Sequence, residues 1–299
     1  LKGVDMLYYY GLPGVLKEQG YQTIYFTTHD DQFDNIAGFL SNSGVERIVS
    51  QKDYPGKEVR SNLGVPDDYL FRYSLPILDA MAMNGNPFLS IYMTASDHGP
   101  YVIPEYFLPR SKRTSEQAVE YADWSIGQFM KMCASKSWFS NTLFVFIADH
   151  GAALESNYEM PISYHHTPLI FFGNELLKGT REFHVLGGQI DVFPTLMGIL
   201  GFPYLNNTLG IDLTRHQRPY IYFGADNKYG VMDDEYFLVV MKSGERRLYS
   251  HPLRLPTNYI DSLPDRADKM QRYADAQMQV AQWMILHRKT GKPERLENK

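Results

Sequence analysis

The sequence has 299 residues, of which 44% are hydrophobic and 21% charged, so it excludes a disordered chain and is long enough for one large α/β domain or two small ones. The net charge of −5 argues against a nucleic-acid partner and gives no polybasic membrane signal. The single cysteine, Cys133, excludes an internal disulfide, and no window of about 18 apolar residues is present to span a bilayer.

Helical and strand-like segments alternate along the first two thirds of the chain. Apolar residues at helical spacing predict helices over 11–22, 34–44, 66–85, 115–136 and 189–201. Short apolar runs predict strands over 23–28, 45–50, 87–96, 141–149 and 167–173. Because these strands do not alternate with polar residues and are separated by helices, we expect a mostly parallel sheet covered by helices on both faces, a three-layer α/β/α fold.

From about residue 218 the pattern changes to short antiparallel strands. Turns are expected at Asp233-Asp234 and Ser243-Gly244, and a final helix is expected over 264–289. We therefore divide the chain into an α/β core, 1–217, and a segment of antiparallel strands and a helix, 218–299, that packs on the same domain.

Acidic and histidine side chains follow three of the predicted strands. They are His29-Asp30-Asp31, Asp97-His98-Gly99 and Asp149-His150-Gly151. Ligands of open α/β sheets bind beyond the carboxyl ends of the strands. One histidine at a strand end is more often structural than functional, but three at the same edge of one sheet predict a functional site.

Asp149 and His150 have the chemistry of a metal-binding pair. Neighbouring side chains at a strand end can both turn toward one point, and a carboxylate oxygen with an imidazole nitrogen suits Zn²⁺ or Mn²⁺. Gly151 would allow a sharp turn close to the ion. The alternative is a capping aspartate beside a histidine that bonds a carbonyl group. For His165-His166, the alternative is a polar loop before the strand at 167–173.

Four segments resemble the sulfatase-type branch of the alkaline phosphatase superfamily, in particular its lipoteichoic acid synthases and phosphoethanolamine transferases. They are LPGVLKEQGYQTIYF, DHGPYVIPEYF, TLFVFIADHG, and HHTPLIFFG with QIDVFPTLMGILG. They occur in the order found in that family, and the resemblance covers nearly the whole chain. It implies an alkaline-phosphatase-like α/β/α sheet with a small C-terminal antiparallel sheet and a terminal helix.

The resemblance also implies roles for individual residues. Asp149 and His150 would be ligands of Zn²⁺ or Mn²⁺, with Ca²⁺ or Mg²⁺ as alternatives. His98 and His166 would be catalytic, binding the phosphate oxygens of the substrate and protonating the leaving group. His29 would lie on the substrate side, although the sequence around it is offset from that of the family. Asp97 stands where the family has a neutral residue, which argues against a metal-binding role.

The beginning of the chain departs from the family pattern. The family places its nucleophile and first carboxylate ligand before the helix that here begins near Gly11, yet residues 1–10 contain no Ser, Thr or Cys and only one acid, Asp5. We therefore expect a C-terminal fragment with an incomplete metal site and no activity alone. Phosphodiester turnover by the 299-residue chain, abolished by Asp149→Ala, would contradict this expectation.

For the intact protein, the resemblance implies a metal-dependent transferase of phosphoglycerol or phosphoethanolamine that acts on a lipid or glycan through a covalent enzyme intermediate. A sulfatase or phosphodiesterase with the same core is an alternative, since the nucleophile is a threonine in the transferases and a modified cysteine in sulfatases. A non-catalytic binding domain is a third possibility. The implied partners are phospholipid head groups or sulfated or phosphorylated glycans. The implied location is bacterial and extracytoplasmic, in the periplasm or at the outer face of the inner membrane, with a membrane anchor N-terminal to this chain.

Overall fold

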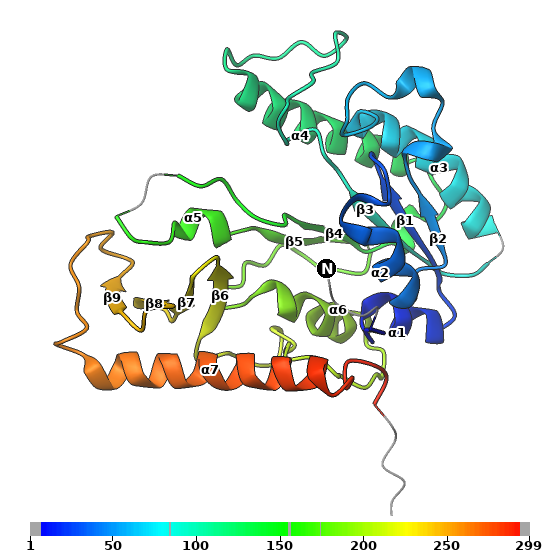
Figure 1. Ribbon diagram of the computed structural model, residues 1–299. Coiled ribbons are helices and arrows are strands. Elements are labelled where there is room, and N and C mark those ends of the chain that lie inside the picture. Colours follow the sequence, from blue (N-terminus) through cyan, green and yellow to red (C-terminus); the bar gives the residue numbers. More distant parts are fainter. Residues whose placement is uncertain (1–6, 84, 155–156, 174, 294–299) are drawn as a thin grey trace, which may run out of the picture. The chain divides into compact units, whose positions relative to one another are not determined.

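The computed structural model describes residues 7–83, 85–154, 157–173 and 175–293 (Figure 1). The backbone separates into two compact units, one formed mainly by residues 1–142 and the other mainly by residues 143–289. Each unit has its own strands and its own buried residues. Asp5 lies outside the described residues, and the division expected between residues 217 and 218 stays a prediction.

The first unit contains a parallel sheet of three strands in the order β2-β1-β3. The strands are β1 (Gln22–Thr27), β2 (Arg47–Val49) and β3 (Phe88–Met93). The central strand β1 pairs in parallel with both neighbours, so that Phe26 lies opposite Val49 of β2 and Tyr92 of β3. The predicted parallel sheet is confirmed for these three strands.

The α-helices of this unit lie where the sequence predicts them. They are α1 (Leu12–Glu18), α2 (Ile36–Asn42), α3 (Asp67–Met83) and α4 (Thr114–Cys133), with short 3-10 helices at Phe33–Asn35, Gln51–Asp53, Gly56–Glu58 and Phe139–Asn141. Phe71 of α3 stacks on Phe129 of α4 at a ring-centroid distance of 4.6 Å, and Tyr92 of β3 lies against both rings. Aromatic packing therefore joins the two longest helices of this unit to the sheet.

The second unit contains two antiparallel sheets. In the smaller one, β4 (Phe144–Ile147) pairs with β5 (Leu169–Phe172). The larger one has four strands in sequential order: β6 (Ile221–Ala225), β7 (Lys228–Met232), β8 (Tyr236–Met241) and β9 (Arg246–Ser250). Asp233-Asp234 and Ser243-Gly244 lie between successive strands of this sheet, as predicted from the sequence.

The strand β8 is buried on both faces of its sheet. Leu238 and Val240 belong to a core that includes residues of α7 (Pro264–Leu286), while Phe237 and Val239 pack on the other side with Met160. Because both faces are covered, the sequence of this strand is a continuous apolar run without alternation. The helix α7 confirms the helix predicted near the end of the chain.

The end of β4 belongs to the second unit, whereas the ends of β1 and β3 belong to the first. The expectation that all three polar strand ends lie at one edge of one sheet stays a prediction. Within the described residues, the partner strand of β4 is β5 alone. The apolar side chains of this pair remain partly accessible, with Ile147 43% and Ile170 53% exposed. The apolar content of these runs predicted that they are strands, but it did not predict which strands they pair with.

Two shorter elements surround the end of β4. A one-turn helix, α5 (Ile162–His165), occupies the position where a polar loop was the alternative. The helix predicted over 189–201 is a 3-10 turn, η5 (Gln189–Asp191), that continues as α6 (Val192–Leu200) and ends at Gly201. Gly201 has a positive φ of 70°, a conformation that glycine adopts without steric cost and that commonly ends a helix.

Candidate active site

Asp149 and His150 lie just beyond the end of β4 and form a pair of metal-type donors. The main-chain N–H of His150 donates to Oδ1 of Asp149 at 2.8 Å. Nδ1 of His150 lies 2.9 Å from the carbonyl oxygen of Gly151, and because a carbonyl only accepts, this contact places the proton on Nδ1. Nε2 therefore keeps its lone pair in the neutral ring, and it lies 3.8 Å from Oδ2 of Asp149. One nitrogen and one carboxylate oxygen thus lie side by side.

The distance between these two atoms fits two ligands of one divalent ion. In a tetrahedral zinc site with ligand distances of about 2.1 Å, neighbouring ligand atoms lie about 3.4 Å apart. The side chain of Asp149 is 75% exposed and that of His150 46%, so both can reach an ion. The described residues contain no group of three or more His, Cys, Asp or Glu side chains placed to hold a metal. Catalytic zinc sites use three protein ligands, so this pair alone would supply two of them.

The loop that follows His150 is fastened to α5. The N–H of Gly151 donates to the carbonyl of Tyr164 at 2.8 Å, and the N–H of Leu154 donates to Oγ of Ser163 at 3.1 Å. A Cβ atom at Gly151 would lie 2.2 Å from the carbonyl oxygen of Ser163, which is closer than real contacts allow. Glycine is therefore required here because α5 approaches the loop closely.

Three ring contacts connect His150, Tyr164, His165 and Phe223 in a row. The ring of Tyr164 stacks on that of His150 at 4.4 Å with an interplanar angle of 20°. His165 meets Tyr164 edge-on and stacks on Phe223 at 4.4 Å. Burial lowers the pKa of His165, and the charge of His150 lowers it further, so His165 behaves as a neutral packing residue at pH 7. Tyr164 was not predicted as a site residue, because its stacking partner lies in a separate segment.

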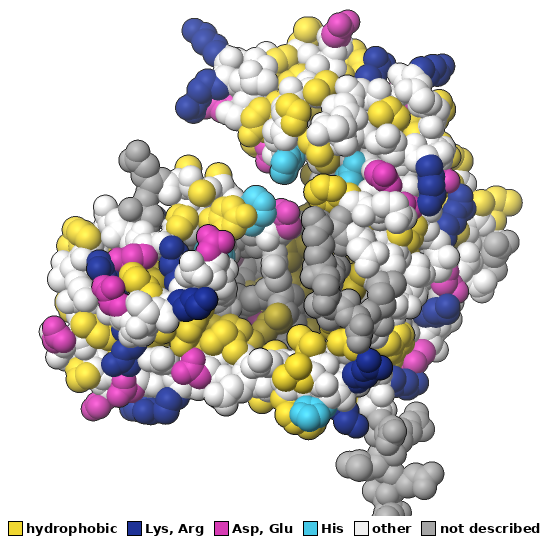
Figure 2. Space-filling model, viewed as in Figure 1, with side chains coloured by type: hydrophobic (Ala, Val, Ile, Leu, Met, Phe, Trp, Pro, Cys, Tyr) yellow, Lys and Arg dark blue, Asp and Glu magenta, His cyan; other side chains and the backbone are white. Residues whose placement is uncertain are grey.

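His166 directly follows α5 and has an exposed side chain. Its imidazole makes no hydrogen bond to any other residue in the part of the chain that the structure describes, so both nitrogens are accessible to a ligand. Histidine side chains reach the surface on the face shown in Figure 2. The catalytic and substrate-binding roles of His166 stay predictions.

Gln189, the first residue of η5, contacts the same strand end. Its side-chain amide donates to the carbonyl oxygen of Ala148 at 2.9 Å and to that of Asp149 at 2.7 Å. From the sequence, Gln189 is expected only to be part of a helix, because a hydrogen bond between residues 40 positions apart leaves no local pattern.

In the first unit, His29 and His98 follow the neighbouring strands β1 and β3. Nδ1 of His29 lies 3.1 Å from Oγ1 of Thr27, and its ring meets Phe33 edge-on at 5.6 Å. Burial lowers the pKa of His29, the carboxylate of Asp30 opposes this effect, and the charge of His98 lowers the pKa further. His98 is therefore near enough to influence the protonation of His29.

His98 lies in a turn that also contains Asp97 and Gly99. Nδ1 of His98 lies 2.7 Å from the carbonyl oxygen of Gly99, and its main-chain N–H donates to the carbonyl of Ala95 at 3.1 Å. Burial raises the pKa of Asp97, and the nearby His98 lowers it in part. The exposed imidazole of His98 thus presents Nε2, as that of His150 does.

Asp67, at the start of α3, holds this turn and was missed as a site residue. Its Oδ1 accepts the N–H groups of Ala95 at 3.0 Å and Ser96 at 3.2 Å, and the residue is 1% exposed. Burial raises the pKa of Asp67, while the hydrogen bonds from Ala95 and Ser96 lower it in part. From the sequence, Asp67 is expected only to lie within the helix predicted over 66–85.

The family model described as Sulfatase matches residues 4–202, which is well over half of the chain. The chain belongs to the sulfatase family. The matched range contains all five predicted site residues, His29, His98, Asp149, His150 and His166. The resemblance to the sulfatase-type branch is thereby confirmed, while the roles of these residues are not tested by it.

Curated relatives of the sulfatase-family chain include two bacterial enzymes. Lipoteichoic acid synthase 2 of Bacillus subtilis (strain 168) is 23% identical over 220 residues, which are 64% of this chain and 32% of that protein. Phosphoglycerol transferase I of Xanthomonas axonopodis pv. citri (strain 306) is 24% identical over 196 residues, 62% of this chain and 28% of that protein. The chain spans about a third of the length of these relatives.

A solved structure confirms the fold class. A protein in the alkaline phosphatase superfamily from Vibrio parahaemolyticus matches with a TM-score of 0.83 at 24% identity, over 97% of this chain and 71% of that one. Across the described ranges of the sulfatase-family chain, no helix combines the length and apolar character needed to cross a membrane.

Proposed function

We propose that the sulfatase-family chain carries catalytic residues of a metal-dependent transferase of phosphoglycerol or phosphoethanolamine. The observation that carries the proposal is the pair formed by Nε2 of His150 and Oδ2 of Asp149, 3.8 Å apart at the end of β4. The similarity to lipoteichoic acid synthase 2 and phosphoglycerol transferase I supports the class of reaction. The head group passes from a phospholipid to a hydroxyl group of a lipid or glycan through a covalent enzyme intermediate.

In this proposal, Asp149 and His150 bind Zn²⁺ or Mn²⁺, or Ca²⁺ or Mg²⁺ in their place. A bound divalent ion supplies positive charge that stabilises oxygens of the transferred phosphoryl group. The stack of Tyr164 on His150 and the Nδ1 contact to Gly151 keep Nε2 of His150 in the position of a ligand. The nucleophile of the covalent intermediate is not among the residues proposed for this site.

The remaining histidines act on the substrate. Nδ1–H of His98 stays on the carbonyl of Gly99, so Nε2 is the atom that, when protonated, donates to a phosphoryl oxygen and gives its proton to the leaving alkoxide, which leaves His98 neutral. His166, with both nitrogens accessible, is proposed to serve the same purpose. His29 is proposed as a neutral substrate-binding group, consistent with its lowered pKa.

The proposed substrates are phospholipid head groups or sulfated or phosphorylated glycans. The proposed location is extracytoplasmic, in a membrane-anchored bacterial protein of the cell envelope. A sulfatase or phosphodiesterase is the second candidate function, favoured by the family match itself. The same donors would serve a sulfate ester, because a transferred sulfuryl group also bears anionic oxygens.

The test compares three substrates in the intact protein: fluorescent phosphatidylglycerol, fluorescent phosphatidylethanolamine and para-nitrophenyl sulfate. We expect release of diacylglycerol from one of the lipids, loss of this activity with a chelator, and recovery with Zn²⁺ or Mn²⁺. Asp149→Asn should lower the rate about 10³-fold, because it removes several kcal/mol of metal-dependent stabilisation. The matched variant Asp97→Asn should change the rate by no more than about threefold.

Other results would overturn the proposal in distinct ways. Hydrolysis of the sulfate ester without lipid turnover would support the sulfatase. Absence of both turnover and bound metal would support a non-catalytic binding domain. Equal losses in Asp149→Asn and Asp97→Asn would remove the basis for assigning the metal to Asp149.

A further inference from the structure

We infer that Gln189 is a positioning residue that fixes the main chain at Asp149 and His150. Its side-chain NH₂ group donates both of its hydrogens to carbonyl oxygens, one to Ala148 at 2.9 Å and one to Asp149 at 2.7 Å. The inference deepens the proposed function, and rests on it, only where it concerns metal binding by the Asp149-His150 pair.

The two acceptors belong to the peptide groups on either side of the Asp149 Cα atom. A peptide group is planar, so holding the carbonyl of Ala148 and the carbonyl of Asp149 fixes two successive planes. The angle between these planes sets φ and ψ of Asp149, and therefore the direction of its side chain. The second plane also contains the N–H of His150, which donates to Oδ1 of Asp149. One amide side chain thus sets the geometry of both donors.

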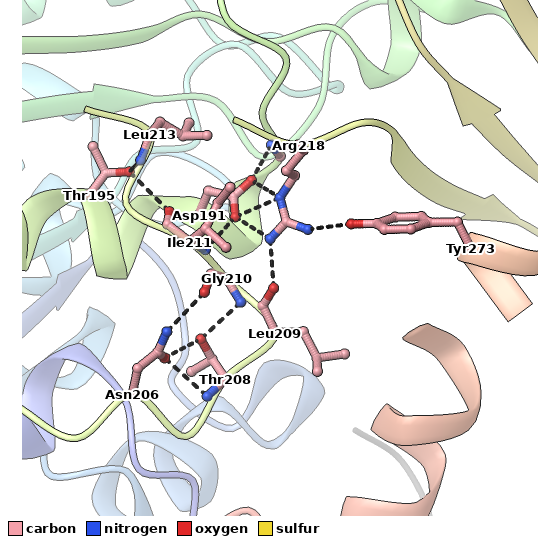
Figure 3. A network of polar contacts seen from close by, with 11 residues as sticks. Asp191, Thr195, Asn206, Thr208, Leu209, Gly210, Ile211, Leu213, Arg218 and Tyr273 are labelled. Carbon is pink, nitrogen blue, oxygen red and sulfur yellow. Dashed lines mark hydrogen bonds and ion pairs between the residues drawn. The ribbon is translucent and has the colours of Figure 1, made fainter. Parts of the chain in front are cut away.

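The turn that contains Gln189 is held by the buried ion pair between Asp191 and Arg218, which Figure 3 shows. Asp191 accepts the N–H of Gly188 at 2.9 Å, and the N–H of Asp191 donates to the carbonyl of Gly188 at 2.9 Å, so the turn that contains Gln189 is closed at both ends. Nε of Arg218 donates to both carboxylate oxygens of Asp191, at 2.9 and 2.7 Å. Asp191 is 0% and Arg218 8% exposed.

Arg218 also donates hydrogen bonds to two groups other than Asp191. Nη1 of Arg218 donates to the hydroxyl of Tyr273 at 3.1 Å, and Nη2 donates to the carbonyl of Leu209 at 2.6 Å (Figure 3). The network therefore connects the turn of Gln189 to α7 and to the chain before β6. A turn held in this way keeps the Gln189 backbone fixed, so that its side chain can act as a rigid support.

The test uses Gln189→Met, which keeps the length of the side chain and removes both donors. Gln217→Met is the matched control, because Gln217 is an exposed glutamine whose side chain has no hydrogen bond among the described residues. Hydrogen exchange of the segment 148–154 in the intact protein reports on the backbone. We expect exchange there to be about tenfold faster in Gln189→Met and unchanged in Gln217→Met, with similar melting temperatures.

Metal affinity provides the second measurement. Titration of the intact protein with Zn²⁺ against a chelator should show about 10- to 100-fold weaker binding for Gln189→Met, as for other residues that orient a metal ligand. Asp149→Asn serves as the reference for losing a ligand. Exchange and affinity equal to those of Gln217→Met would overturn the inference while leaving the proposed function standing. If Asp149→Asn binds Zn²⁺ like the wild type, the metal role fails, and the exchange result alone decides on Gln189.

Discussion

The two Asp-His-Gly segments of the chain, 97–99 and 149–151, share three residues and one contact but differ in their aspartates. In both, Nδ1 of the histidine lies against the carbonyl oxygen of the following glycine, at 2.7 Å in the first and 2.9 Å in the second. Each histidine therefore presents Nε2 outward. The same local sequence produces the same imidazole geometry in two different units.

The aspartates differ because the main-chain N–H of the histidine has a different acceptor in each segment. The N–H of His150 donates to Oδ1 of Asp149, which brings Oδ2 of that carboxylate to 3.8 Å from the imidazole. The N–H of His98 instead donates to the carbonyl of Ala95, and among the described residues no ion pair joins Asp97 to the His98 ring. One segment thus offers a carboxylate and an imidazole together, whereas the other offers an imidazole alone.

The two segments also differ in the residues that hold them in place. The largest effect on stability is expected for the ion pair between Asp191 and Arg218, which holds the turn of Gln189 next to 149–151. Replacing Arg218 with Met leaves the buried carboxylate of Asp191 without its charged partner, so we expect a loss of about 3–5 kcal/mol in the free energy of unfolding. Urea denaturation followed by circular dichroism measures this change. Arg215→Met, which removes a surface ion pair with Asp212, should cost at most about 0.5 kcal/mol. Equal losses in the free energy of unfolding for the two variants would show that the buried ion pair does not stabilise this part of the chain.

The second prediction separates an imidazole that binds substrate from one that binds metal. His98→Gln should lower the rate of head-group transfer about 10²–10³-fold, the usual cost of one donor to a developing charge, and leave the metal content unchanged. His150→Gln should lower both the rate and the metal content, because it removes a proposed ligand. Rate assays with elemental analysis of the same preparations distinguish the two. A loss of bound metal in His98→Gln would contradict the proposal that His150 binds the metal and His98 binds the substrate.

Most of the fold could be predicted because its signals are local. The apolar run at 23–28 and the glycine that ends 189–201 each act through nearest neighbours, and both elements formed as expected. The pairing of β4 with β5 was missed because strand partners are chosen by tertiary contacts that a single apolar run does not encode.

The candidate site could be predicted only where its residues are chemically distinctive. Asp149 and His150 were predicted as donors because a carboxylate and an imidazole, the ligand types that suit Zn²⁺, stand side by side at a strand end. Gln189, Tyr164 and Asp67 were missed because their types are ordinary and their partners lie in other segments. Supporting residues of this kind become visible only when the backbone brings their partners together.

The smallest expected effect concerns Asp67, which accepts hydrogen bonds from the main chain directly before the segment 97–99. Burial raises the pKa of this carboxyl in the folded state, so its contribution to stability is fully present below the unfolded pKa of about 3.9 and is lost as pH rises through the folded pKa. In Asp67→Asn, Oδ1 can still accept the N–H groups of Ala95 and Ser96, and the group no longer titrates. The variant should therefore gain stability relative to the wild type as pH rises from 4 to 8, by about 1.4 kcal/mol for each unit by which the pKa is raised. Urea midpoints measured across this range test the sign: a relative gain at low pH instead would mean that the amide hydrogen bonds, rather than burial, dominate at Asp67.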